Sequence, residues 1–110
     1  MRKFQKKQAE EFVALLGQAH DEIRKAIEKK NIAAARSLLA DCQDGAIALG
    51  DLIEKAEGEG CVTISMLEAY CELVFRIYEE LGREQTVNVN KIYKMLRQSF
   101  FRIESSVMPV

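Results

Sequence analysis

Few residues in this 110-residue sequence have the type and spacing that enzyme chemistry requires. His20 is the single histidine, and the three cysteines, Cys42, Cys61 and Cys71, are not grouped with it. A Cys–His nucleophile pair needs an exposed thiol in an electropositive setting, whereas Cys42 and Cys71 fall on an apolar helical stripe. We therefore predict inert core thiols and no catalytic residue.

Metal and paired-carboxylate chemistry also lack a motif. No Glu-x-x-His occurs, which excludes the di-iron carboxylate bundle, and the cysteines lack the spacing of a zinc site. Acidic residues occur in adjacent pairs, namely Glu10-Glu11, Asp21-Glu22 and Glu79-Glu80. Adjacent helical positions point about 100° apart, so these pairs cannot act together on a substrate. We predict a non-enzymatic chain with no metal and no cofactor.

His20 suggests one alternative function. The stretch His20-Asp21-Glu22-Ile23-Arg24 resembles the histidine box of sensor kinases, whose exposed helical histidine accepts a phosphoryl group. It has one extra residue before Ile23, no proline follows it, and there is no nucleotide-binding domain. His20 flanks the apolar stripe at Ala19, so we expect it to be partly exposed. The resemblance implies a histidine phosphoryl carrier; the plainer interpretation is a boundary histidine without chemistry.

Apolar residues recur at alternating steps of three and four, which is the pattern of helices packed as an antiparallel coiled coil. Three short interruptions divide the chain into predicted helices at about 3–29, 32–57, 64–81 and 89–105. The predicted core positions are Ala9, Phe12, Leu16, Ala19, Ile23 and Ala26; Ile32, Ala35, Leu39, Cys42, Ala46, Leu49, Ile53 and Ala56; Ile64, Leu67, Cys71, Val74, Tyr78 and Leu81; and Val89, Ile92, Leu96 and Ile103.

Capping residues mark the interruptions. Asn31, Thr63 and Asn88 are predicted N-caps, because their side chains can accept a hydrogen bond from a free backbone N–H. Gly58 and Gly82 are predicted to end the second and third helices, and residues 83–88 to form the third loop. Inside the second helix, Gly45 and Gly50 each cost about 1 kcal/mol relative to alanine, so we expect a neighbouring helix to approach closely there.

These elements predict an all-α fold in a single domain spanning residues 1–110. The second and third helices are similar in length and joined by a short loop, so they must lie antiparallel. Two architectures remain open: an antiparallel four-helix bundle, or two stacked helical hairpins of the tetratricopeptide kind. The tetratricopeptide signature itself is absent.

The overall composition of the chain bears on its cellular location and on whether it binds nucleic acid. No apolar run approaches the roughly 20 residues that span a bilayer, and an odd number of cysteines fits free thiols in a reducing compartment. We therefore predict a cytoplasmic protein with no membrane span. The last helix interleaves basic and aromatic residues, but a net charge of −1 disfavours nucleic-acid binding. Those residues are Lys91, Tyr93, Lys94, Arg97, Phe100, Phe101 and Arg102.

Charge is uneven along the chain. The segments 31–62 and 63–82 carry net charges of −4 and −3, while 1–30 and 83–110 each carry +3. This pattern fits complementary packing, and it also fits an acidic groove that docks a partner protein or a second copy. For the groove we predict seam-edge anchors at Leu38, Leu52, Tyr70 and Ile77, with a charged rim of Asp41, Glu68 and Glu72.

One family resemblance covers most of residues 31–110. The stretches Gln43–Glu54, Glu57-Gly58-Glu59-Gly60 and Leu67–Glu72 resemble the N-terminal helical region of clostridial proteins that carry a CDP-glycerol glycerophosphotransferase-like (teichoic acid) module. The matching residues are packing and turn residues, and none of the transferase's functional residues maps onto this chain. The resemblance implies an alternative function as the accessory domain of a cell-envelope transferase.

Overall fold

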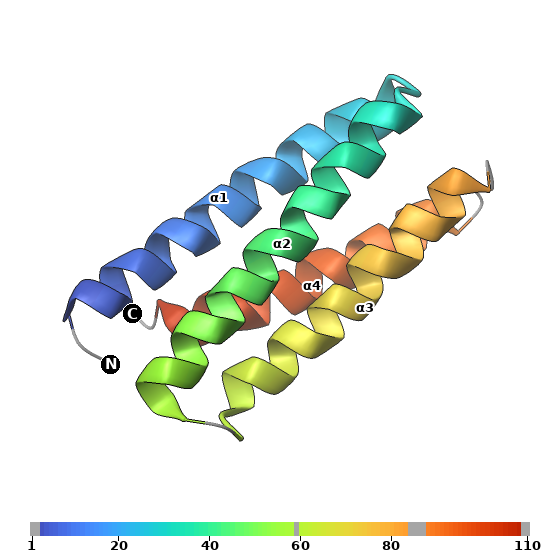
Figure 1. Ribbon diagram of the computed structural model, residues 1–110. Coiled ribbons are helices and arrows are strands. Elements are labelled where there is room, and N and C mark those ends of the chain that lie inside the picture. The colour runs from blue at the N-terminus through green and yellow to red at the C-terminus, as the bar shows by residue number, and fades with distance from the viewer. Residues whose placement is uncertain (1–2, 59, 84–87, 109–110) are drawn as a thin grey trace.

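The computed structural model describes residues 3–58, 60–83 and 88–108 as four antiparallel helices (Figure 1). They are α1 (Lys3–Glu28), α2 (Ile32–Glu57), α3 (Val62–Gly82) and α4 (Val89–Val107). The molecule measures 43 × 22 × 22 Å. No helix among these residues is both long and apolar enough to cross a membrane.

The helices form a closed ring. Within the described part of the chain, α1 packs against α2 and α4, and α3 packs against α2 and α4, while the diagonal pairs do not approach closely. Stacked hairpins of the tetratricopeptide kind would bring α1 against α3. The observed order is that of an up-and-down four-helix bundle, which settles the architecture that the sequence left open.

Two predicted turns are confirmed in detail. Asn31 accepts a hydrogen bond from the Ala34 backbone N–H at 3.2 Å and caps α2, while Lys30 takes a positive φ of 57° to reverse the chain. Gly58 ends α2 with φ 85° and ψ 173°, a conformation almost restricted to glycine, and donates its N–H to the Glu54 carbonyl.

Four predicted helix ends differ from the observed ones by one or two residues, and one of them is at α1, which ends at Glu28 and not at residue 29. The helix α3 begins at Val62 with Cys61 at the N-cap, so Thr63 is not the cap. The Thr63 hydroxyl instead hydrogen-bonds the Ser106 hydroxyl on α4. This contact accompanies the extension of α4 beyond residue 105 to Val107, whose side chain is buried.

The ends of α3 and α4 that face each other in sequence also differ in detail from the prediction. The helix α3 includes Gly82, and Arg83 takes the C-cap position. Asn88 occupies the N-cap of α4 without a side-chain bond, and residues 84–87 lie outside the described residues.

The core follows the predicted stripe closely on α2 and α4 and is displaced by one residue at two points on α1 and at three points on α3. On α1, Val13 and His20 are buried in place of Phe12 and Ala19. On α3, the buried residues that replace the predicted Ile64, Cys71 and Tyr78 are Thr63, Tyr70 and Ile77. A one-residue step is enough to exchange a core position for an edge position, because adjacent side chains point about 100° apart.

The two glycines inside α2 face neighbouring helices, but neither is forced by contact. A Cβ at Gly45 would lie 3.4 Å from the Leu16 side chain, and one at Gly50 would lie 3.8 Å from the Leu67 side chain. The second distance is an ordinary van der Waals contact. The expected close approach therefore does not explain Gly50.

Candidate functional site

The centre of the bundle holds one polar layer to which every helix contributes. The His20 Nε2 atom lies 2.6 Å from the Tyr70 hydroxyl, and both side chains are fully buried. The His20 ring lies edge-on to Phe100, with ring centroids 4.6 Å apart. Cys42 on α2 is also buried and influences the pKa of Tyr70. The layer thus joins α1 to α3 across the diagonal, where the two backbones do not meet.

Burial sets the protonation of this layer. It lowers the pKa of His20 to about 4, with the Arg97 charge acting in the same direction and Asp21 opposing it. Burial raises the pKa of the Cys42 thiol to about 11 and raises the pKa of Tyr70 well above its usual value. All three groups are therefore neutral near pH 7.

Solvent hardly reaches the side chains of this layer. The expected partial exposure of His20 is wrong, because its side chain is 0% accessible. A buried, neutral imidazole held by Tyr70 offers a phosphate donor no approach. The predicted inert thiol is consistent with the raised pKa of Cys42, since the thiolate is the reactive form. Tyr93 further fixes α1 by donating its hydroxyl to the His20 carbonyl oxygen at 3.0 Å.

The accessible feature is a groove between α2 and α3, which we call the α2–α3 groove. Its first hollow has a volume of about 200 Å³ and is mostly apolar. It is lined by Leu39, Ala40, Gln43, Asp44, Val74, Phe75 and Tyr78. Drug-sized ligands occupy pockets of about 300–1,000 Å³, so this hollow matches a single protruding side chain better than a free metabolite.

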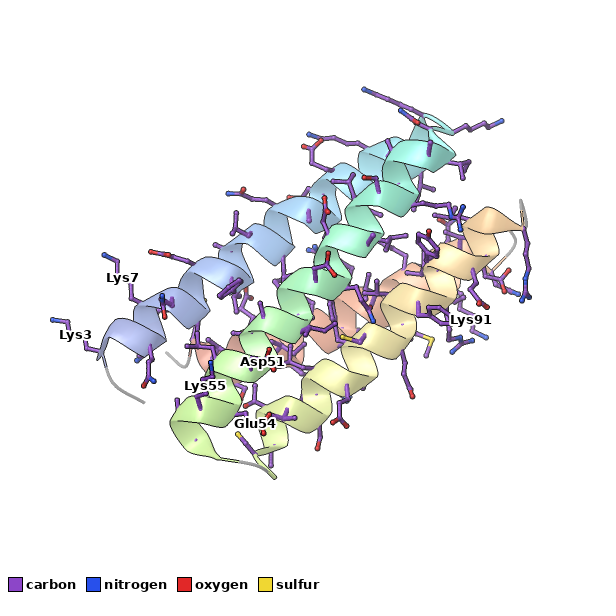
Figure 2. All side chains as sticks on the ribbon, viewed as in Figure 1. Lys3, Lys7, Asp51, Glu54, Lys55 and Lys91 are labelled. Carbon is purple, nitrogen blue, oxygen red and sulfur yellow. The ribbon has the colours of Figure 1, made fainter. Side chains whose placement is uncertain are left out.

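A second hollow continues the groove toward the other end of the helices. It measures about 510 Å³, shares Gln43 with the first, and is rimmed by Asp51, Glu54, Glu68 and Glu72. Its remaining lining residues are Ala46, Ile47, Gly50, Ile64, Leu67 and Cys71. In Figure 2, Asp51 and Glu54 lie on α2 toward α3, whereas Lys3 and Lys7 extend outward from α1.

Charge and exposed apolar surface coincide in this groove. Ile47 and Phe75 are each 54% exposed at its edges. None of the rim carboxylates of Asp44, Glu68 or Glu72 forms an ion pair with a described residue. Near the first hollow, the Arg36 guanidinium stacks 4.0 Å from the centre of the Tyr78 ring. The floor of the groove is mostly apolar, and the rim of its second hollow is negative.

The structure sorts the seven predicted groove residues into three groups. Glu68 and Glu72 line the groove. Leu38 and Leu52 are half-buried against the core, and Asp41 is exposed, but none of these three lines either hollow. Tyr70 and Ile77 were wrongly placed at the groove edge, because both are fully buried core residues.

Several groove residues were not predicted from the sequence. Asp44, Ile47, Asp51, Glu54 and Phe75 all line the groove. One signal was available for two of them. Ile47 follows Ala46 and Phe75 follows Val74, so each is a large apolar residue directly after a core position, where a solvated helix would place a polar one.

The described residues offer no site for a metal ion. Among residues 3–58, 60–83 and 88–108, no group of three or more histidine, cysteine or acidic side chains is arranged to hold a metal ion. Comparisons with protein-family models, curated proteins and solved structures found no match. The resemblance to transferase-associated helical regions therefore stays a prediction.

Proposed function

We propose that this chain is a non-enzymatic interaction module whose α2–α3 groove binds a basic, amphipathic helical segment of a protein partner. The observation that carries the proposal is the joint presence of an apolar floor, exposed Ile47 and Phe75, and unpaired rim carboxylates in one groove. Single exposed apolar residues are common on soluble proteins, whereas a continuous apolar groove with a polar rim is typical of binding sites.

The dimensions favour a helix as the bound element. The two hollows share Gln43 and follow α2 from Leu39 to Glu54, a distance of about 22 Å at 1.5 Å per residue. A docked helix presents apolar anchors on one face at spacings of three, four and seven residues. Lysine and arginine beside those anchors would meet the acidic rim, which steers association and fixes orientation.

The free state of the described cysteines is relevant to the cellular compartment of the protein. Cys42, Cys61 and Cys71 are all free thiols. Free thiols persist in reducing compartments, which supports a cytoplasmic location as part of the same proposal.

The test is a fluorescence-anisotropy titration with a labelled model peptide of leucine and lysine at heptad spacing, about 14 residues or four helical turns long. We expect saturable binding to the native chain. The double variant Glu68→Lys/Glu72→Lys should weaken binding about tenfold or more, because the two introduced lysines repel the basic peptide. Both positions are exposed, so circular dichroism should show unchanged helix content.

The matched control reverses two acidic residues away from the groove. Glu11 and Glu28 are exposed on α1, so Glu11→Lys/Glu28→Lys changes the net charge equally. We expect this control to bind with nearly native affinity. An equal loss in both variants would reduce the effect to overall charge, and unchanged affinity in the groove variant would refute the proposed site.

A further inference from the structure

The outer face of α4 carries a second surface whose chemistry is opposite to that of the groove. Phe101 is 65% exposed and Met95 is 40% exposed. Exposed basic residues surround them, namely Lys91, Lys94, Arg97 and Arg102. A shallow hollow at Arg97, Gln98, Phe101 and Arg102 marks the centre of this surface, which we call the α4 face.

The spacing on this face suits a helical docking element. Arg97 and Phe101 are four residues apart and therefore lie on the same side of α4. Arg102 follows Phe101 directly and points about 100° away from it, so Arg97 lies beside the aromatic ring and Arg102 lies further round the same outer face. The helix as a whole contains four basic residues and one acidic residue, Glu104. The α4 face is thus a basic, amphipathic helical surface with an aromatic anchor.

The two surfaces are available at the same time. In Figure 1, α2 and α3 lie in front and α4 lies behind them. Two different patches on one subunit that complement each other produce head-to-tail association, which closes into rings or continues as chains.

We propose that the α4 face of a second copy is an occupant of the α2–α3 groove. Phe101 of that copy fills the hollow of about 200 Å³ beside Phe75 and Tyr78. Its Arg97 and Arg102 face the carboxylates of Asp44, Glu68 and Glu72. The proposal rests on the proposed function for the groove and adds the identity of one partner.

The first experiment is sedimentation velocity of the native chain from micromolar to millimolar concentration. We expect reversible association that weakens as salt rises, because the contacts are between opposite charges. Phe101→Ala should raise the dissociation constant about tenfold or more. Leu15→Ala is the matched control, since Leu15 is 62% exposed on α1 and lies on neither surface, and it should leave association unchanged.

The second experiment exchanges the charges. Glu68→Lys/Glu72→Lys places positive charges opposite Arg97 and Arg102 of a second copy, and Arg97→Glu/Arg102→Glu places negative charges opposite Glu68 and Glu72. Each variant alone should be monomeric. An equimolar mixture should associate, because every contact between unlike copies again joins opposite charges. A mixture that stays monomeric would overturn the proposal.

The outcomes separate this inference from the proposed function. A native chain that is monomeric at all concentrations but binds the leucine–lysine peptide would refute self-docking and leave the groove proposal standing. Association that is insensitive to the groove charges would likewise refute self-docking. Binding of a labelled single-stranded RNA to the α4 face, without self-association, would assign that face to a different partner and overturn the inference.

Discussion

His20 is the residue whose environment departs most from its usual one. Its side chain is fully buried, its Nε2 atom pairs with Tyr70, and its Nδ1 atom has no hydrogen-bond partner in the described structure. A buried unpaired nitrogen costs stability. Because four helices meet at this layer, the His20–Tyr70 bond can fix how α1 and α3 are aligned along their length, as buried polar residues do in some coiled coils.

The lowered pKa of His20 predicts a pH-dependent stability. An unfolded chain protonates this imidazole near 6.5, whereas the folded chain does so only near 4. Between those values the unfolded state binds more protons, so the free energy of unfolding falls as pH falls. From about pH 7 to about pH 5, this group should remove about 2 kcal/mol.

The check is chemical denaturation of the native chain and of His20→Gln at both pH values. The variant is destabilised at neutral pH but has no imidazole to protonate, so the gap between the two proteins should narrow by about 2 kcal/mol at the lower pH. Parallel pH profiles would show that His20 titrates normally in the folded state.

The sequence could not predict this layer, for a reason specific to the pair. A histidine and a tyrosine each appear unsuited to the middle of a core when considered alone, because burial of an unpaired polar group is costly. Each becomes acceptable only with the other as its partner, and His20 and Tyr70 lie 50 residues apart in the sequence. The predicted core positions Ala19 on α1 and Cys71 on α3 therefore each lie one residue away from the observed core positions, His20 and Tyr70.

At the scale of the helix, Gly50 offers the cleanest prediction. Its position inside α2 has room for a methyl group, with Leu67 at ordinary contact distance. Gly50→Ala should therefore raise the free energy of unfolding by up to about 1 kcal/mol, because alanine loses less backbone entropy in a helix. Urea denaturation measures the change.

The matched variant is Gly58→Ala. Gly58 has open space around it but takes φ 85° and ψ 173°, so alanine should destabilise by about 1–3 kcal/mol through backbone strain alone. A destabilised Gly50→Ala protein would contradict the observed spacing between α2 and α3.

Helix number and most helix boundaries were predictable because they depend on local signals. The α2 span 32–57 is confirmed to the residue, since Asn31 caps one end and Gly58 the other. The start of α3 and the end of α4 were not predictable in the same way. Thr63 and Ser106 bond to each other across two helices, and no local pattern of residues reports such a contact.

At the scale of the whole molecule, closure of the bundle gives two faces of opposite character. The helices α2 and α3 present the acidic groove, and α4 presents basic residues around Phe101. The charge asymmetry was readable from the sequence, and it correctly placed Glu68 and Glu72 in the groove. The residues that line the groove could not be identified from the sequence. The rotation of each helix about its own axis decides which side of its core stripe faces the space between α2 and α3.

The central claim is that the α2–α3 groove binds a basic amphipathic helix, and the most direct test is a titration of ¹⁵N-labelled protein with the leucine–lysine peptide, followed by amide chemical shifts. We expect shifts concentrated at Gln43, Asp44, Ile47, Glu72 and Phe75. A peptide with the same leucines but glutamate for lysine should produce none. Shifts confined to α1, or no shifts with the basic peptide, would contradict the account.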